Sequence, residues 1–317
     1  MNQTKKKNPL KRLLSMRGMG QVVTVTIGLI VLLVAFALIN PNFWSPTNRT
    51  NLLRQIAPIL IIGIAQSYVL ITGNIDLSIG SVVGMSTMVA ATLMSKGIMS
   101  PIPALLVTLL CCLLIGVLNG LLVAKFKLPP FIATLGTMTV ARGIAQLVNG
   151  NYNTDSIMKF YPEAAQTFKN VFYYGKTLGL YNGIWIAIIL WIVFNFLLSK
   201  TRTGRYIYAT GSNIDAARLS GVNVVSTTVI AYVVSAFCSF VVGIITCATV
   251  GQGTMDGGNS YEMYAVAASV IGGVSTLGGQ GILLGTVVGA AIWGTLQNGL
   301  QFAGAPVAFT TPPIASL

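Results

Sequence analysis

Charged residues are scarce in this chain, and histidine is absent. Only 8% of the 317 residues are charged, against about a quarter in an ordinary soluble domain. The six acidic residues form no obvious pair for acid–base work, and the lack of histidine removes the commonest metal ligand and general base. The four cysteines fall within apolar stretches, at spacings typical of neither a zinc site nor a disulfide framework. No metal site is therefore expected, and an enzyme acting within a membrane has little material here.

Short catalytic motifs are missing as well. The sequence contains no G-x-x-x-x-G-K-[ST], G-x-S-x-G, H-E-x-x-H or C-x-x-C pattern. It therefore offers no P-loop for binding and hydrolysing ATP, and we expect no catalytic residues and no cofactor of its own.

Apolar residues, in contrast, make up 54% of the chain and occur in long uninterrupted runs. Residues 22–39, 97–124 and 222–252 contain no charge at all. A water-soluble protein cannot bury so much continuous apolar surface, whereas each helical crossing of a bilayer needs about 20 apolar residues. The pattern predicts an all-α, polytopic transmembrane helix bundle with about nine spans. The candidate spans are residues 22–39, 56–73, 77–95, 102–124, 131–149, 183–199, 226–250, 264–280 and 281–300.

The basic residues predict how this bundle is oriented. The net charge of +13 does not indicate nucleic-acid binding, because the basic residues flank apolar spans and such flanking charges encode orientation in a membrane. Residues 1–21 form a basic arm. The apolar run that follows this arm is too long for the apolar region of a signal peptide. Placing this arm in the cytoplasm puts most basic residues inside. The inside set is then Lys5, Lys6, Lys7, Lys11, Arg12, Arg17, Lys125, Lys127, Lys200, Arg202, Arg205 and Arg218, and the outside set is Arg49, Arg54, Lys96, Lys159, Lys169 and Lys176.

Two glycine-rich interruptions break the helical pattern, at residues 72–80 and 271–281. Non-helical backbone at membrane depth is tolerated only where protein or a water-filled cavity satisfies its polar groups, and such breaks often mark a translocation path. A tight turn at the membrane surface is the alternative. The glycines predicted to break the helices are Gly73, Gly80, Gly272 and Gly273.

A few polar residues near these breaks are candidates for a path or its gates. Asp76 is the acidic residue most expected at membrane depth, where it should pair, cap a helix or line water. Together with Asn74 and Ser78 it either caps the helix that begins near residue 77 or takes part in the path. Arg142 is a natural partner for a buried carboxylate. The full set of path candidates is Asn74, Asp76, Ser78, Thr134, Thr137 and Arg142.

Residues 200–224 form the one long polar stretch on the predicted cytoplasmic side between two strong spans. Asn213 suits a helix N-cap, Asp215 a first turn and Gly221 a C-terminal stop. A short helix outside the membrane, with Ala216, Ala217 and Leu219 as small contact residues, is expected here. It either docks into a groove of a partner or is a surface turn without one.

Four motifs occur in an order that resembles one known family. They are GNIDLSIG at residues 73–80, PFIATLGTM at 130–138, residues 211–224 around Asn213, and AASVIGGVS at 267–275. Over about residues 20–305 the chain resembles the membrane permeases of bacterial ATP-binding-cassette (ABC) importers for simple sugars, the ribose, xylose and galactose permeases of the branched-chain amino acid and sugar permease superfamily. The resemblance implies the type II importer architecture, with a permease domain at residues 22–305.

The resemblance also implies partners and a mechanism. Two such permease subunits pair with a cytoplasmic ATPase, which alone binds ATP and magnesium, and a periplasmic or lipoprotein sugar-binding protein docks outside. It implies that the coupling residues seated on the ATPase are Asn213, Asp215, Ala216, Ala217, Arg218, Ser220 and Gly221. A self-contained secondary transporter driven by an ion gradient is the alternative function. The family continues past residue 304 into a last helix, whereas residues 306–317 here are proline-broken and too short to span, so we expect that helix to be missing.

Overall fold

The computed structural model describes residues 19–304. The predictions for the basic arm before residue 19 and for the tail at 306–317 lie outside the described residues. The main helices are α2 (Met19–Ile39), α3 (Pro46–Ile71), α4 (Ile79–Ser95), α5 (Pro101–Ala124), α6 (Pro130–Leu147), α8 (Asn182–Lys200), α11 (Val224–Val250), α12 (Tyr261–Ile271) and α13 (Leu283–Phe302). The shorter elements are η1 (Pro41–Trp44), α7 (Pro162–Lys169), η2 (Asn170–Tyr174), β1 (Lys176–Thr177), β2 (Leu180–Tyr181), α9 (Arg202–Ser212) and α10 (Ile214–Leu219).

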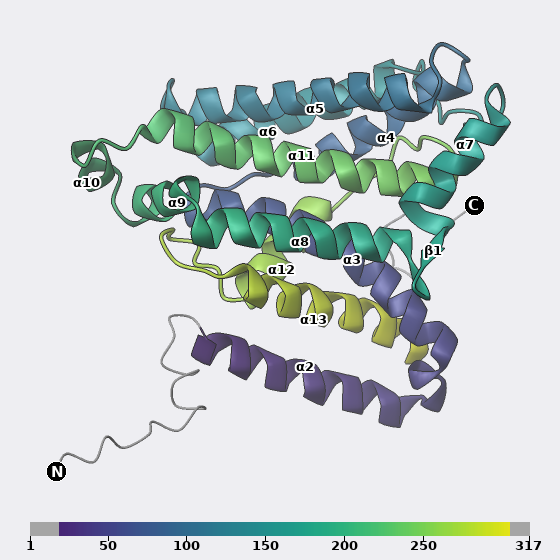
Figure 1. Ribbon diagram of the computed structural model, residues 1–317, viewed down its shortest axis with the longest axis horizontal. Coiled ribbons are helices and arrows are strands. Elements are labelled where there is room, and N and C mark those ends of the chain that lie inside the picture. Colours follow the sequence, from purple (N-terminus) through teal and green to yellow (C-terminus); the bar gives the residue numbers. More distant parts are fainter. Residues whose placement is uncertain (1–18, 305–317) are drawn as a thin grey trace.

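The long helices run back and forth between two ends of the molecule (Figure 1). One end carries α9 and α10 and is called the α10 end. The other carries α7 and the antiparallel pair of β1 with β2 and is called the α7 end. Helix α2 starts at the α10 end, so the chain enters the bundle on the side where α10 projects (Figure 1). This arrangement confirms the predicted all-α polytopic bundle.

Each predicted span matches one of the long helices, with two differences at the ends. Helix α3 begins at Pro46 rather than residue 56, because Ser45 caps it and a proline suits its first turn. Helix α12 ends at Ile271 rather than residue 280, since a glycine-rich segment follows. Between residues 19 and 304, five helices are long and apolar enough to cross a membrane, namely α2, α3, α5, α8 and α11. The count of nine spans stays a prediction.

Helices α3 and α11 form the centre of the bundle and α2 lies at its edge. Within the most apolar 18-residue stretch of each helix, 78% of the stretch is buried in α3 and 67% in α11, but only 11% in α2. Helix α5 packs closely along α11 because it presents glycines there. A Cβ atom on Gly120 would lie 2.5 Å from the Cα atom of Val229. Small residues of this kind let backbones approach in lipid, where burial of apolar surface does not drive helices together.

Candidate functional site

The first helix break, at residues 72–78, joins α3 to α4 at the α10 end. Gly73 turns the chain there with φ +79°, a conformation that costs other residues energy. Asp76 then stabilises the turn, because its Oδ1 atom accepts hydrogen bonds from the backbone N–H of Ser78 at 2.9 Å and from its hydroxyl at 2.6 Å. The side chain of Asp76 therefore orders the residues just before α4, while the N-cap residue Ser78 makes no side-chain cap of its own.

Asp76 is also the start of a buried polar network that connects the first break to three helices. Its Oδ2 atom accepts a hydrogen bond of 2.7 Å from Ser235 of α11. Asn119 of α5 donates to the hydroxyl of Ser78 at 2.9 Å and accepts from Thr137 of α6 at 2.6 Å. All five side chains are at most 3% exposed. The fold thus brings together Asp76, Ser78 and Thr137, which the sequence offered as separate candidates.

Two other path candidates make only local contacts. Asn74 donates hydrogen bonds to the hydroxyl and carbonyl of Thr72, two residues earlier. The hydroxyl of Thr134 donates to the carbonyl of Pro130 in the preceding turn of α6, at 2.8 Å. The structure does not connect either side chain to the Asp76 network.

Arg142 does not reach the first break; it holds the segment between α11 and α12. Its Nη1 atom donates to the carbonyls of Met255 at 2.9 Å and Gly257 at 3.0 Å. That segment and the start of α12 contact α4, since a Cβ atom on Gly84 would contact the carbonyl of Gly257, and one on Gly80 would contact the carbonyl of Gly258 and the side chain of Glu262. Gly80 lies inside α4, so its prediction as a helix-breaking glycine is wrong: this position needs glycine for close packing.

The second helix break, at residues 272–282, joins α12 to α13. Gly273 adopts φ +91° and turns the chain, as predicted. Gly272 keeps a right-handed conformation at the C-cap of α12, and a Cβ atom there would lie 2.6 Å from the backbone nitrogen of Thr286. One predicted glycine therefore provides a turn, and its neighbour provides room for α13.

The two breaks and helix α9 meet at one point. The backbone N–H of Gly279 donates a 2.9 Å hydrogen bond to the carbonyl of Ile71. A Cβ atom on Gly278 would lie 2.8 Å from both the Gly211 carbonyl oxygen of α9 and the Cα atom of Gly73, and one on Gly211 would overlap the Ile71 carbonyl. We call this meeting of Gly73, Gly211, Gly278 and Gly279 the glycine junction.

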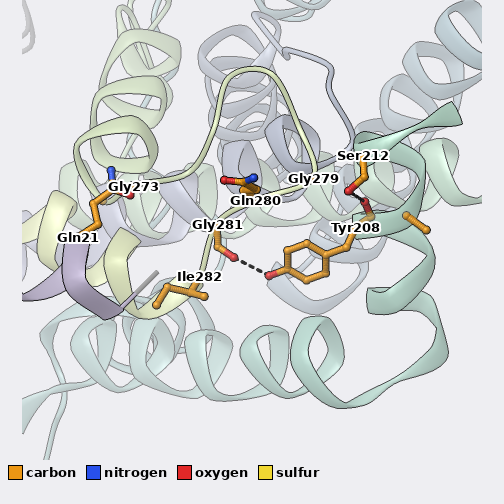
Figure 2. A pocket seen from close by; sticks show the side chains of 10 residues that line it. Gln21, Tyr208, Ser212, Gly273, Gly279, Gln280, Gly281 and Ile282 are labelled. Atoms are coloured by element: carbon orange, nitrogen blue, oxygen red, sulfur yellow. Dashed lines mark hydrogen bonds between the residues drawn. The ribbon is translucent and has the colours of Figure 1, made fainter. Parts of the chain in front are cut away.

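A side chain of α9 strengthens the same contact. Tyr208 donates a hydrogen bond of 2.6 Å to the carbonyl of Gly281, and Ser212 bonds back to the Tyr208 carbonyl (Figure 2). Burial raises the pKa of the Tyr208 phenol to about 12, so it remains a hydrogen-bond donor at neutral pH. Helix α9 is thus tied to the second break by a side chain and to both breaks by backbone contact.

Helix α10 follows α9 directly and projects from the bundle (Figure 1). As the sequence predicts, Asn213 caps it by accepting from the backbone N–H of Ala216 at 2.9 Å, Asp215 lies in the first turn, and Gly221 follows with φ +81°. Ala217 is only 4% exposed, whereas Leu219 is 89% exposed. The outward face of α10 is therefore formed by Leu219 and its neighbours, and Ala217 packs inward. The exposed coupling candidates are Asn213, Asp215, Ala216, Arg218, Ser220 and Gly221.

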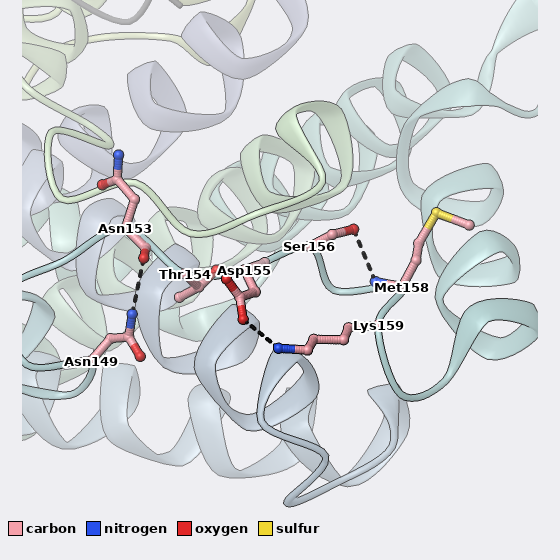
Figure 3. A network of polar contacts seen from close by, with 7 residues as sticks. All are labelled: Asn149, Asn153, Thr154, Asp155, Ser156, Met158 and Lys159. Carbon is pink, nitrogen blue, oxygen red and sulfur yellow. Dashed lines mark hydrogen bonds and ion pairs between the residues drawn. The ribbon is translucent and has the colours of Figure 1, made fainter.

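A polar loop at the α7 end forms hydrogen bonds to the segment between α11 and α12, the same segment that Arg142 contacts. The backbone N–H of Gly253 donates to the Thr154 hydroxyl at 2.8 Å, and the N–H of Met255 donates to the Asn153 side chain at 2.9 Å. Lys159 pairs with Asp155 at 2.7 Å on the exposed side of this loop (Figure 3). This hydrogen bond and charge hold the pKa of Asp155 below its usual value. The α7 end therefore presents an ordered polar surface.

Sequence reasoning missed Asn119 and Ser235, which complete the Asp76 network. Asn119 is the only amide within the charge-free run at 97–124, and an isolated polar residue at membrane depth is a functional candidate by default. Ser235 gave no such signal, because serine is common in membrane helices. Tyr208 was missed because its partner is a backbone carbonyl far away in the sequence. No group of metal-ligating side chains occurs between residues 19 and 304.

Comparison with known proteins agrees with this architecture. Residues 48–315 match the family model described as branched-chain amino acid transport system / permease component. The chain is 40% identical to the ribose import permease protein RbsC of Haemophilus influenzae over 278 residues, covering 87% of this chain and 84% of the relative. It is 36% identical to RbsC of Bacillus subtilis over 279 residues, covering 88% and 84%. It is 35% identical to the galactofuranose transporter permease protein YtfT of Escherichia coli over 307 residues, covering 94% and 86%. No solved structure matches the chain.

The fold and the comparisons together define a class, the multi-pass helical membrane permeases of bacterial inner membranes. The chain belongs to the branched-chain amino acid transport system / permease component family.

Proposed function

We propose that this chain is the permease subunit of an ABC importer that moves a monosaccharide of the ribose, xylose or galactose class into the cell. Relatives that cover most of the chain are named ribose, galactofuranose and D-allose permeases. These names favour a sugar importer over the alternative of an ion-driven secondary transporter. ATP hydrolysis is assigned to a partner subunit, because the sequence carries no P-loop.

The glycine junction is the observation that carries the mechanism. A push on the exposed face of α10 passes into α9, and Gly211 of α9 lies against the backbone of both helix breaks. Closely packed backbone with no intervening side chain is stiff, since packed interiors transmit displacement rather than absorb it. Motion of an ATPase docked on α10 would therefore shift α3, α4, α12 and α13 together.

The proposed orientation places the α10 end and the N-terminus in the cytoplasm. The basic residues Lys125, Lys127, Lys200, Arg202 and Arg205 lie at or next to helix termini at that end, in the direction of the positive-inside rule. The ATPase then docks on α10, and a sugar-binding protein docks on the polar α7 end. A second permease copy completes the path, and membrane lipid surrounds the pair.

We further propose that the Asp76 network is part of the gate, and that Asn74, Thr134 and Arg142 lie along or beside the path. The support is that Asp76, Ser78 and Thr137 join the first break to α5, α6 and α11. A break that moves relative to these helices must rearrange buried hydrogen bonds, and such an arrangement switches between discrete states more readily than it deforms gradually.

Reconstitution into proteoliposomes tests the proposal. The full chain is combined with a candidate two-domain ATPase and a candidate secreted sugar-binding protein from the same genome, and with labelled ribose, galactose or allose. Uptake that requires both ATP and the binding protein is the expected result. Sugar uptake by the permease alone under an ion gradient would instead establish the secondary transporter.

A further inference from the structure

A pocket near the α7 end, formed within one copy of the chain, has the composition of a carbohydrate site. Its volume is about 260 Å³, somewhat below the roughly 300–1,000 Å³ of sites for drug-sized ligands. The start of α3, the end of α11, the start of α12 and the end of α13 surround it, and η2 adds Tyr173. A cavity of this size suits a small ligand such as a single sugar ring.

Aromatic rings form one side of the pocket. Tyr261 and Tyr264 both line it, and their ring centroids lie 5.7 Å apart. Trp293 stands behind Tyr264, with a centroid separation of 5.5 Å. The rings thus form a continuous cluster, tilted by 41° and 39° from one ring to the next. Flat aromatic faces of this kind suit the apolar C–H face of a sugar ring, and tyrosine and tryptophan combine a large apolar body with a polar tip.

One buried polar atom of the lining, Nε of Arg54, has no hydrogen-bond partner within residues 19–304. The guanidinium of Arg54 lies between the rings of Tyr173 and Tyr181, 4.2 Å from each centroid. A buried donor without an acceptor is unfavourable. A hydroxyl oxygen of a ligand would supply an acceptor for this N–H group.

The charge of the lining disfavours a cationic ligand. Among the described residues no carboxylate lines the pocket, and Arg54 is its one charged group, with both faces covered by rings. The other polar side chains include the amides of Gln55 and Gln297. Amides both donate and accept hydrogen bonds, which matches hydroxyl groups.

An outer cavity adjoins this pocket and leads toward the α7 end. It has a volume of about 280 Å³ and shares Arg54, Gln55 and Tyr173 with the aromatic pocket. Its remaining lining includes the amides of Asn48, Asn51 and Asn298. The polar outer cavity and the aromatic inner pocket together form a graded route from the end surface into the bundle.

We propose that the pocket around Arg54, Tyr261, Tyr264 and Gln297 is a weak holding site for a neutral monosaccharide within each permease copy. This inference rests on the proposed function, because it places the site on the side from which sugar arrives. We expect weak binding, since a site on a transport route must release its ligand as readily as it takes it up.

Fluorescence titration of the purified full chain tests this inference. Trp293 reports on Tyr264, so ribose, galactose or allose is expected to give a saturable change, which Trp293→Phe removes. Tyr264→Ala should weaken binding at least tenfold, whereas Tyr264→Phe keeps the ring and should bind as the wild type does. The matched control is Tyr152→Ala, whose side chain is 74% exposed on the α7-end loop and which should change nothing.

Three outcomes would overturn the inference. The first is the absence of a saturable response to any of the sugars, and the second is binding by Tyr264→Ala equal to that of the wild type. The third is a response to inorganic phosphate in place of sugar, which would show an anion site. If Tyr264→Ala fails to fold, Gln297→Ala takes its place in the comparison. Wild-type protein that imports sugar with its ATPase yet fails this titration refutes the holding site alone. Wild-type protein that imports no sugar refutes the proposed function instead.

Discussion

The backbone N–H of Gly279 donates a 2.9 Å hydrogen bond to the carbonyl of Ile71, so the two helix breaks are joined directly although they lie far apart in the sequence. Gly211 of α9 packs against the same carbonyl. Helix α9, which leads to the exposed helix α10, thus touches both breaks through backbone atoms. This close contact depends on the absence of side chains at the junction.

Gly211→Ala tests the junction. The added Cβ atom would overlap the Ile71 carbonyl and lie 2.7 Å from the Gly279 nitrogen. Backbone atoms cannot rotate away as a side chain does, so α9 must separate from the breaks, at a cost of about 1–3 kcal/mol. We expect a lower melting temperature in detergent and a loss of at least tenfold in ATP-driven uptake.

Gly28→Ala is the control for this substitution. Gly28 lies in α2 with open space around it, so the same methyl group should leave uptake unchanged. Equal behaviour of the two variants would show that the junction transmits nothing.

Leu219→Asp tests the docking face of α10. Leu219 is 89% exposed, and burying a leucine against a partner contributes about 1.5–3 kcal/mol. Losing that contact should weaken binding of the ATPase by roughly ten- to a hundredfold, measured by titrating the purified ATPase onto immobilised permease.

Leu178→Asp is the matched control for the docking face. Leu178 is 86% exposed in the turn between β1 and β2 at the opposite end. If this variant loses the ATPase while Leu219→Asp keeps it, the proposed orientation is reversed. Ala217 is unsuited to the test, because its side chain is buried and a large substitution would disturb α10 itself.

The sequence allowed the spans, the two breaks and the short capped helix to be predicted, because each depends on local chemistry. Apolar runs of sufficient length predict crossings, and Asn213 and Gly221 predict the ends of α10. The packing partners of these elements could not be predicted from local sequence. That Gly80 makes room for Glu262, or that Tyr208 reaches Gly281, depends on contacts between residues distant in the chain. The inward direction of Ala217 likewise became visible only when α10 was placed against its neighbours.

Ser235→Ala tests the Asp76 network. The change removes the hydroxyl that donates to Oδ2 of Asp76. A buried carboxylate oxygen is then left without that donor, and hydrogen bonds to carboxylates contribute about 1.5–3 kcal/mol. We expect a clear fall in the free energy of unfolding, measured by thermal or denaturant melting in detergent.

Ser239→Ala, one turn further along α11, is the control for the network. Ser239 is also buried, but its hydroxyl donates to the Ser235 carbonyl within the same helix. Removing the Ser239 hydroxyl should lower the free energy of unfolding by well under about 1 kcal/mol, because the Ser235 carbonyl already accepts a backbone hydrogen bond within the helix. If the network contributes nothing to stability, the two variants will have the same free energy of unfolding.

Thr154→Val and Asp155→Asn compare two interactions that could order the α7-end loop, namely the buried hydrogen bond of Thr154 and the exposed ion pair of Asp155. Thr154 is 4% exposed and accepts from the Gly253 N–H, so valine leaves a buried donor unsatisfied at a cost of about 1–3 kcal/mol. The pair of Asp155 with Lys159 is exposed, and exposed pairs contribute little. We therefore expect faster amide exchange at Gly253 in Thr154→Val and no measurable change in Asp155→Asn.

The pH dependence of the loop provides a second measurement. The pKa of Asp155 is lowered by Lys159 in the folded protein, so any contribution of the pair is present above the ordinary aspartate pKa, about 3.9. It is lost only as the pH falls through the lower, folded value. Exchange at Gly253 should then be insensitive to Asp155→Asn at neutral pH and at pH 5 alike. A loop that loosens in Asp155→Asn but not in Thr154→Val would show that the surface ion pair, rather than the buried hydroxyl, holds the segment gripped by Arg142.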